Sequence, residues 1–200
     1  MQVASIVLAA GFSRRLGSAK QMARIGGQTL LERAVKTALE AGLAPVFVVQ
    51  REEQKTELKT AFCVANLDSS GFESLVVMVI NPEAAEGMAS SVRAGVRAAA
   101  GATGVVVLGC DQPAVTAAHL RELARGGDEV VASSYAGRKG VPAYFPAHAF
   151  AALLELRGDA GARGLLQGAR AVELPGGELD VDTVEDLEQA VRLYGRPPGL

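Results

Sequence analysis

Short apolar runs rich in β-branched residues alternate along the chain with longer stretches of helical periodicity. The runs predict strands at residues 3–8, 45–50, 75–80 and 104–109, and the stretches between them predict helices. Strands separated by helices are typical of a wound, mostly parallel α/β sheet. The first and last of these runs are apolar throughout, as expected for strands that are buried on both faces of such a sheet.

Capping signals mark the starts of two helices. Thr29 and Glu32 have the spacing of a capping box and predict a helix that ends near Gly42. Thr183 and Asp186 predict a last helix near the end of the chain. Further helices are predicted over residues 52–62 and 116–125, and residues 87–95 lead into an alanine-rich helix that ends at Ala100.

A hairpin is predicted in the second half of the chain. Residues 129–134 and 141–145 have the pattern of strands, and the turn-forming residues 136–140 lie between them. Strands joined by a short turn run antiparallel, so the sheet should contain one antiparallel element. We therefore expect a three-layer, Rossmann-like α/β fold, and the length of 200 residues suits a single domain spanning residues 1–200.

Charge and composition exclude several classes of partner. The formal net charge of −2 gives no broad basic field, so nucleic acid is not an expected partner. Cys63 and Cys110 are too few for a disulfide framework or a zinc site, which indicates a reducing compartment. No basic leader precedes the first strand, and no apolar run approaches the roughly 18 residues of a membrane span. We expect a cytoplasmic protein that does not contact membranes.

The segment from Leu8 to Lys20 predicts a phosphate-binding loop. It follows a buried strand, and open α/β sheets bind ligands at the carboxyl ends of their strands. Gly11 and Gly17 allow tight turns and a close approach of backbone N–H groups to an anion. The cations of the segment are Arg14, Arg15 and Lys20. The spacing matches neither the GxxxxGK(S/T) loop nor the GxGxxG fingerprint, and a solvated basic loop is the structural alternative.

Asp111 is the best placed candidate for a metal ligand. It follows the buried run 104–109 directly, so it should lie at the same edge of the sheet as the loop. Clustered phosphates share their charge with Mg²⁺, which prefers one or two carboxylates together with phosphate and water oxygens. Asp182 is the second candidate, with Asp180 and Asp186 as alternatives. The structural alternatives are a turn residue for Asp111 and a helix cap for Asp182.

The other reactive side chains give weaker signals. His119 and His148 lie on predicted surface segments without a second ligand at metal-binding spacing, so we expect structural roles. Cys110 fits a small buried hydrophobic residue better than a nucleophile. Arg138 and Lys139, at the predicted hairpin tip, either contact an anionic substrate or are solvated.

The loop segment matches a known signature. LAAGFSRRLGSAK at residues 8–20, followed by GQTLL at residues 27–31, resembles the LAAGxSxRMGxxK signature of nucleotidyltransferases. It is most similar to the molybdenum-cofactor cytidylyltransferase group. The likeness covers nearly the whole chain, in blocks that keep the family's order. These blocks are Asn81-Pro82 with Gly87 and Ser91, Asp111-Gln112-Pro113, Gly140 with Pro142, Gly158-Asp159 with Gly161-Ala162-Arg163, and residues 180–183.

The resemblance implies a nucleotidyltransferase fold and a set of site residues. The implied catalytic residues are Arg15, Lys20 and Asp111. The implied nucleotide-binding residues are Leu8, Ala9, Ala10, Gly11, Arg15, Lys20 and Ser91. The implied acceptor-binding residues are Gly140, Pro142, Asp159 and Arg163. The implied Mg²⁺ ligands are Asp111 and Asp182.

The resemblance also implies a reaction, in which CMP is transferred from CTP to a phosphorylated acceptor and pyrophosphate is released. The implied acceptor is molybdopterin, and a molybdoenzyme or its chaperone would be the protein partner. CTP is favoured because Ala10 completes the LAAG form of the cytidine-using branch, whereas the guanosine-using branch carries a second glycine. Leu16 in place of Met, Val184 in place of Pro, and Gln50-Arg51 in place of a Gly depart from the pattern and concern substrate identity.

Several functions remain open at this point. Relatives on similar folds use sugar phosphates or methylerythritol phosphate as acceptors. Part of the resembled group is assigned as NAD(P)H-dependent reductases, which is a different enzyme class. A module that binds the cofactor and delivers it without turnover is the third possibility.

Overall fold

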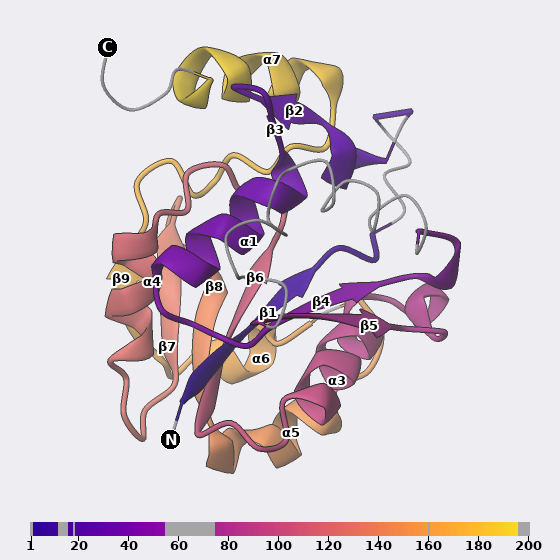
Figure 1. The fold of residues 1–200 in the computed structure, drawn as a ribbon. Coiled ribbons are helices and arrows are strands. Elements are labelled where there is room, and N and C mark those ends of the chain that lie inside the picture. Colours follow the sequence, from indigo (N-terminus) through magenta and orange to yellow (C-terminus); the bar gives the residue numbers. More distant parts are fainter. Residues whose placement is uncertain (1, 12–15, 18, 55–74, 160, 196–200) are drawn as a thin grey trace.

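A computed structural model describes residues 2–11, 16–17, 19–54, 75–159 and 161–195 of the chain. Its centre is a seven-stranded sheet with the order β5-β4-β1-β6-β8-β7-β9 (Figure 1). The strands are β1 (Val3–Leu8), β4 (Val46–Gln50), β5 (Val76–Ile80), β6 (Gly104–Gly109), β7 (Val131–Tyr135), β8 (Arg138–Pro146) and β9 (Arg170–Glu173). A separate two-stranded ribbon pairs β2 (Arg24–Ile25) with β3 (Gln28–Thr29).

Helices cover both faces of the sheet. The helices are α1 (Leu30–Glu40), α3 (Met88–Ala98), α4 (Ala117–Ala124), α5 (Phe150–Leu154), α6 (Arg163–Leu166) and α7 (Val184–Tyr194). Helices α1 and α4 pack on one face, and α3, α5 and α6 pack on the other. Helix α7 packs against the ribbon β2–β3, above the sheet in Figure 1.

The pairing of the strands confirms the expected fold class. Strand β8 runs antiparallel to both of its neighbours, β6 and β7. The other described pairs of the large sheet, including β7 with β9, are parallel. The protein is therefore a three-layer, Rossmann-like α/β structure with one antiparallel element.

Strand β1 marks the point where the winding of the sheet changes direction. From β1 the chain adds β4 and then β5 on one side, and it crosses back to add β6 on the other side. Strands β1 and β6 are parallel, and Leu8 lies opposite Gly109. The segments that follow the two strands therefore leave the same edge side by side, and such a switch point is where open α/β sheets bind ligands.

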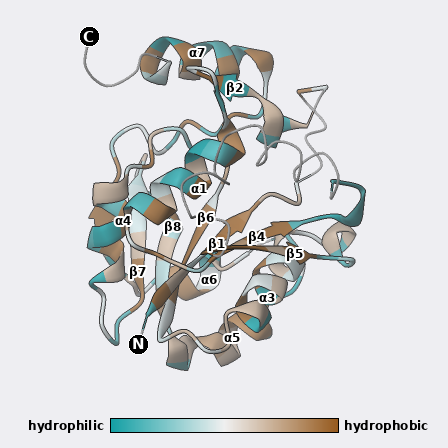
Figure 2. Ribbon diagram, viewed as in Figure 1, coloured by the Kyte–Doolittle hydropathy of each residue, from teal (hydrophilic) through white to brown (hydrophobic). Residues whose placement is uncertain are grey.

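The core lies on both faces of the central strands. Figure 2 shows β1, β4 and β6 as mostly hydrophobic. Successive side chains of a strand point to opposite faces, so Val7 packs toward α1 and α4, whereas Ile6 packs toward α3. A Cβ atom at Gly95 of α3 would lie 2.4 Å from Cγ2 of Ile6, so the missing side chain lets the helix approach the sheet closely.

Local signals in the sequence located most of these elements. Both capping boxes are present, with Thr29 and Glu32 at the start of α1 and Thr183 and Asp186 at the start of α7. The hairpin prediction was wrong in one detail. Strand β8 already begins at Arg138, so Ala136 and Gly137 alone form the turn. Elements β9, α5 and α6 were not predicted.

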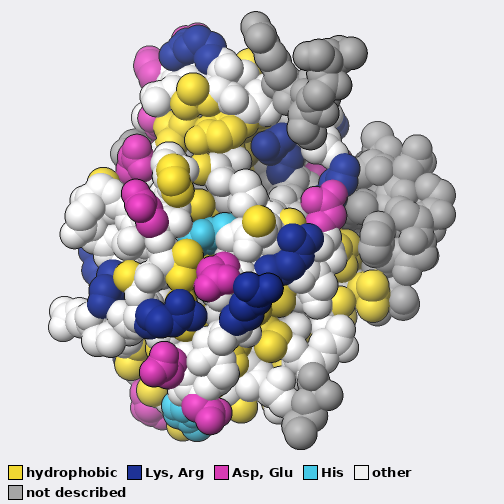
Figure 3. Space-filling view, turned by 90° about the vertical axis from the view of Figure 1, so that its left-hand side faces the viewer, with side chains coloured by type: hydrophobic (Ala, Val, Ile, Leu, Met, Phe, Trp, Pro, Cys, Tyr) yellow, Lys and Arg dark blue, Asp and Glu magenta, His cyan; other side chains and the backbone are white. Residues whose placement is uncertain are grey.

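Two further predictions meet the limits of the described residues. Of the helix predicted over residues 52–62, the structure describes a single 3₁₀ turn at Glu52–Gln54, and the rest lies outside the described residues. Cys63, Arg14 and Arg15 also lie outside them. None of the helices in the described part of the chain combines the length and the apolar character needed to cross a bilayer. On the face drawn in Figure 3, acidic and basic side chains are interspersed.

The prediction that His119 lies on the surface was wrong, because this residue is buried. His148 is exposed, as predicted. The imidazole of His119 packs between α4 and β7, where Nε2 lies 2.7 Å from Oγ of Ser133. The Ser133 hydroxyl donates its hydrogen to the carbonyl of Pro142 at 2.6 Å, so Nε2 of His119 must be the donor to Ser133. Burial lowers the pKa of His119 and keeps the ring neutral.

We expect His119 to make stability sensitive to acid. The unfolded chain binds a proton at the ordinary pKa of about 6.5, while the buried ring resists protonation. The folded state should therefore lose stability as the pH falls below that value, and the loss should grow until the pH passes the lowered pKa of the folded state. Melting temperatures at about pH 7.5 and pH 5.5 should differ more for the wild type than for His119→Gln, in which the amide nitrogen replaces Nε2. Equal shifts in both proteins would contradict this assignment.

Replacement of Gly95 tests the close approach of α3 to the sheet. In Gly95→Ala the added methyl group would overlap Ile6, and we expect a loss of about 1–3 kcal/mol of unfolding free energy. Gly101→Ala is the matched control, because no atom lies within 4 Å of its added Cβ. Urea unfolding should show a lower midpoint with an unchanged slope for the first variant alone. A midpoint for Gly95→Ala as high as that of the control would show that the contact is not tight.

Candidate functional site

A pocket of about 410 Å³ opens at the carboxyl ends of β1 and β6. This volume is within the range of small-molecule sites. The first part of its lining comes from the segments that follow β1 and β6 and from the last third of the chain: Leu8, Ala9, Ala10, Gly11, Lys20, Gln21, Gly109, Cys110, Asp111, Gln112 and Asp180. The remaining lining residues are Ala84, Gly87, Met88, Ser91, Tyr135, Arg138, Lys139, Gly140, Val141, Asp159, Ala162, Arg163 and Leu166.

The end of β6 is shaped to hold the Asp111 carboxylate. A Cβ atom at Gly109 would lie 2.4 Å from Oδ1 of Asp111, so the carboxylate occupies space that a side chain at position 109 would need. The carbonyl oxygen of Asp111 accepts a hydrogen bond of 2.9 Å from the backbone N–H of Val181. This bond places the segment that carries Asp180 and Asp182 beside the end of β6.

The ammonium group of Lys20 lies between two carboxylates. It donates a short hydrogen bond to Oδ2 of Asp111 and a second one, 3.0 Å long, to Oδ1 of Asp182. Asp111 and Asp182 are 91 and 162 positions from Lys20 in sequence, and the fold alone brings the three residues together. The side chains of Lys20 and Asp111 are mostly buried, so their attraction is screened less than that of a surface pair.

The electrostatics of the site favour bound cations. Burial lowers the pKa of Lys20, but the charge and hydrogen bond of Asp111 and the hydrogen bond to Asp182 outweigh this effect and raise the pKa overall. Burial, followed by the negative charge of Asp111, raises the pKa of Asp180 to about 6. The acidic side chains of the site therefore keep Lys20 protonated, and Asp111 disfavours a second negative charge on Asp180.

The donor set fits a divalent cation. The carboxylates of Asp111 and Asp182 already converge on one positive group, the Lys20 ammonium. In the described part of the chain no cluster of three or more His, Cys, Asp or Glu could hold a metal. Two carboxylates suit Mg²⁺ or a similar ion that completes its shell with phosphate and water oxygens. The carboxylate of Asp186 caps α7, where it accepts hydrogen bonds from the backbone N–H and the hydroxyl group of Thr183.

The residues implied for the nucleotide lie along one part of the pocket. Leu8, Ala9, Ala10 and Gly11 all line it, as do Lys20 and Ser91. Ala9 is held by backbone hydrogen bonds, since its N–H donates to Val49 and its carbonyl accepts from the side chain of Gln54. The hydroxyl oxygen of Ser91 accepts a hydrogen bond from Asn81, which leaves its own hydrogen to donate. Arg15 lies outside the described residues, and its role stays a prediction.

Three of the four residues implied for the acceptor line the same pocket. These are Gly140, Asp159 and Arg163. Pro142 is not among the lining residues, because it is buried within β8. Arg138, at the start of β8, lines the pocket and lies over the ring of Tyr135, 5.2 Å from its centre. Arg138 is thus at the pocket and is not only a solvated hairpin tip.

Cys110 does not have the properties of a nucleophile. It is buried, and burial together with the negative charge of Asp111 raises the pKa of its thiol to about 12. A thiol with this pKa stays protonated at neutral pH, whereas reactive cysteines are thiolates. This agrees with the expectation of a small buried residue.

The sequence did not single out several residues that line the pocket. Gln21, Met88 and Tyr135 belong to this group. Gln21 is 1% exposed, and its Nε2 has no hydrogen-bond partner among the residues that the structure describes. Position in the sequence was the only signal for two of them. Gln21 follows Lys20, and Tyr135 ends the first strand of the hairpin.

The fold and the site define a class of protein, the open α/β proteins whose ligand pocket lies at a topological switch point. Residues 5–174 match the model of the MobA-like NTP transferase domain, and the chain belongs to this family. It is therefore a nucleotidyltransferase of MobA-like type.

Named relatives and solved structures are similar to this chain over most of its length. The chain is 35% identical to the purine catabolism protein PucB of Bacillus subtilis over 94% of its own length and 95% of that protein. It is 34% identical to a probable molybdenum cofactor guanylyltransferase of Opitutus terrae over 74% of its own length and 69% of that protein. Among solved structures, Rv0371c of Mycobacterium tuberculosis in complex with manganese superposes with a TM-score of 0.73 at 27% identity, covering 96% of this chain and 99% of that one.

Proposed function

We propose that this protein transfers a nucleotidyl group from a nucleoside triphosphate to molybdopterin and releases pyrophosphate. The favoured donor is CTP, so the transferred group would be CMP. The observation that carries the proposal is the position of Lys20 between Asp111 and Asp182 at the pocket. A cation beside two carboxylates can bind both the triphosphate and the metal that accompanies it. The relative that is named a probable molybdenum cofactor guanylyltransferase supports molybdopterin as the acceptor. The product would pass to a molybdoenzyme or its chaperone.

The proposed chemistry needs no covalent intermediate. A phosphate oxygen of the acceptor attacks the α-phosphorus of the nucleotide, and the bond from that phosphorus to the bridging oxygen of the pyrophosphate breaks. Lys20 offsets negative charge on the phosphates, and backbone N–H groups near Gly11 orient them. Asp111 and Asp182 would hold a divalent cation, Mg²⁺ in our proposal, which supplies further positive charge for the triphosphate.

In this scheme Lys20 binds either the carboxylates of Asp111 and Asp182 or the phosphates of the nucleotide. In the ligand-free protein its ammonium group is bound to Asp111 and Asp182. When nucleotide and metal bind, the carboxylates would exchange Lys20 for the divalent cation, and Lys20 would turn to the phosphates. A manganese complex of the relative Rv0371c supports a divalent cation in this family.

The identity of the base rests on smaller features. Ala10 is 5% exposed and lines the pocket, and its methyl group takes space that a glycine would leave open. This supports the smaller base, cytosine. The arginines at the other part of the pocket, Arg138 and Arg163, support an anionic acceptor.

Pyrophosphate release with each of the four nucleoside triphosphates and Mg²⁺, in the presence and absence of molybdopterin, tests the reaction, the base and the acceptor together. We expect release to require molybdopterin and to be fastest with CTP. If release is fastest with GTP, guanine replaces cytosine in the proposal, and the proposed reaction class stays the same. Oxidation of NADH with a dye acceptor and no pyrophosphate, or tight nucleotide binding without turnover, would contradict the proposal.

Variants of the site provide the controls for this assay. Lys20→Ala and Asp111→Ala should each lower kcat by about 100- to 1000-fold, because each removes a charge that acts on the transferring phosphates. Lys36→Ala is the matched control, since that lysine is 52% exposed on α1 and pairs only with the surface residue Glu40 in the described structure. Circular dichroism should confirm that all three variants fold. Near-normal turnover in either site variant would contradict the assignment.

A further inference from the structure

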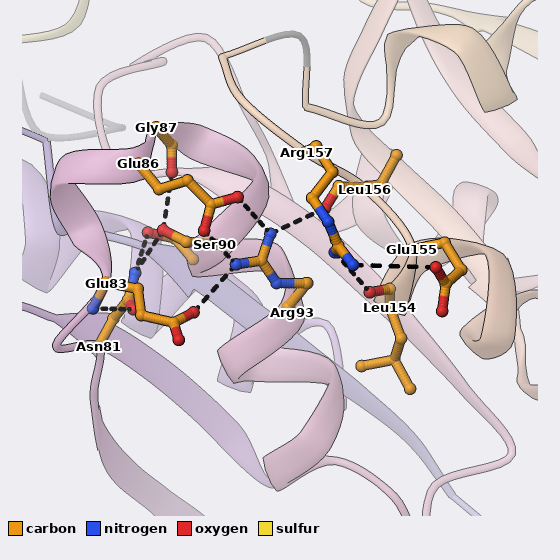
Figure 4. A network of polar contacts seen from close by, with 11 residues as sticks. Asn81, Glu83, Glu86, Gly87, Ser90, Arg93, Leu154, Glu155, Leu156 and Arg157 are labelled. Atoms are coloured by element: carbon orange, nitrogen blue, oxygen red, sulfur yellow. Dashed lines mark hydrogen bonds and ion pairs between the residues drawn. The ribbon is translucent and has the colours of Figure 1, made fainter.

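A buried arginine outside the pocket joins two of the pocket's walls. The proximal wall consists of residues 83–91, of which Ala84, Gly87, Met88 and Ser91 line the pocket. The distal wall consists of residues 156–159 and 161–169, of which Asp159, Ala162, Arg163 and Leu166 line it. The side chain of Arg93 is 5% exposed and contacts both walls (Figure 4).

The guanidinium of Arg93 uses both terminal nitrogens in this network. Nη2 bonds Glu83 at 3.0 Å and Glu86 at 2.5 Å, and Nη1 bonds the second oxygen of Glu86 at 2.9 Å. Nη1 also donates to the backbone carbonyl of Leu156 at 2.8 Å. A planar, forked group can serve these partners at once, whereas a lysine ammonium is a point charge without the fork.

The two walls touch where Arg93 holds them. The backbone N–H of Ala89 donates to the carbonyl of Gly158 at 3.0 Å. A Cβ atom at Gly87 would lie 2.3 Å from Oδ1 of Asp159, so these two pocket residues lie against each other without space between them. A shift of the proximal wall is therefore transmitted to Asp159.

The far end of the distal wall has a separate attachment. Nζ of Lys139 donates to the carbonyls of Gln167 at 2.9 Å and Ala169 at 2.6 Å. The distal wall is thus tied to the sheet at one end and to the proximal wall at the other. At the Arg93 end the distal wall contacts α3, the helix that carries Ser91 on the nucleotide side.

We propose that Arg93 is a positioning residue that couples the two substrate sites, so that nucleotide bound against the proximal wall orders the distal wall for the acceptor. This inference rests on the proposed function for the identity of the two substrates. Coupling of this kind is reciprocal, so bound acceptor also tightens nucleotide binding by the same factor. Neither Arg93 nor its partners Glu83 and Glu86 line the pocket in the described structure, so the effect acts through the walls.

The test compares Arg93→Met with Arg97→Met, an exposed arginine one turn further along α3. Hydrogen–deuterium exchange of peptides from residues 156–169 is measured with and without CTP or GTP and Mg²⁺. Nucleotide should protect these peptides in the wild type and in Arg97→Met but not in Arg93→Met. The KM for molybdopterin should rise by about tenfold or more in Arg93→Met, with a much smaller change in kcat. Arg93→Lys should restore part of both effects.

Each outcome decides the proposal. Unchanged protection and KM in Arg93→Met overturn it, as does a lack of nucleotide-induced protection in the wild type. An equal loss of kcat at constant KM would indicate a merely structural role and also overturn it. If Arg93→Met does not fold, Arg93→Lys and Glu86→Gln carry the same comparison. If the wild type does not use molybdopterin, the proposed function fails, while the exchange experiment with nucleotide still decides the coupling.

Discussion

Strands β1 and β6 run in parallel with Leu8 opposite Gly109, and the site depends on this pairing. The pairing sets the segment that leads to Lys20 beside the segment that begins with Cys110 and Asp111. The buried, apolar character of both strands fixes their place in the centre of the sheet. Winding changes direction between them, and the pocket opens at this edge of the sheet.

Charge balance is the second constraint on the site. Asp111, Asp180 and Asp182 lie close enough together that burial and the charge of Asp111 raise the pKa of Asp180 to about 6. Lys20 compensates part of this negative charge in the ligand-free protein. The arrangement is suited to an exchange of cations, because a divalent metal can take over the carboxylates while Lys20 serves phosphates. The Arg93 network plays a similar part away from the pocket, where one buried cation holds two acidic groups and a backbone carbonyl.

The sequence predicted features that depend on local interactions. The capping pairs at Thr29 and Thr183 act within one turn, and the apolar runs reflect burial of each strand separately. Asp111 and Lys20 could be placed at one sheet edge because parallel topology follows from the alternation of elements. Long-range packing carried the rest. His119 is buried against Ser133 of β7, and Arg93 bonds Leu156, which is 63 residues away. Neither contact can be predicted from a local sequence pattern.

We expect Lys20 and a divalent cation to compete for the Asp111 and Asp182 carboxylates. A titration of ligand-free protein with Mn²⁺, followed by electron paramagnetic resonance, tests it directly. Lys20→Met should bind Mn²⁺ more tightly than the wild type by about tenfold or more, equivalent to about 1.4 kcal/mol, because the ammonium group that competes with the metal is removed. Adding Asp182→Asn to that variant should abolish the gain. Equal Mn²⁺ affinity in Lys20→Met and the wild type would contradict the account.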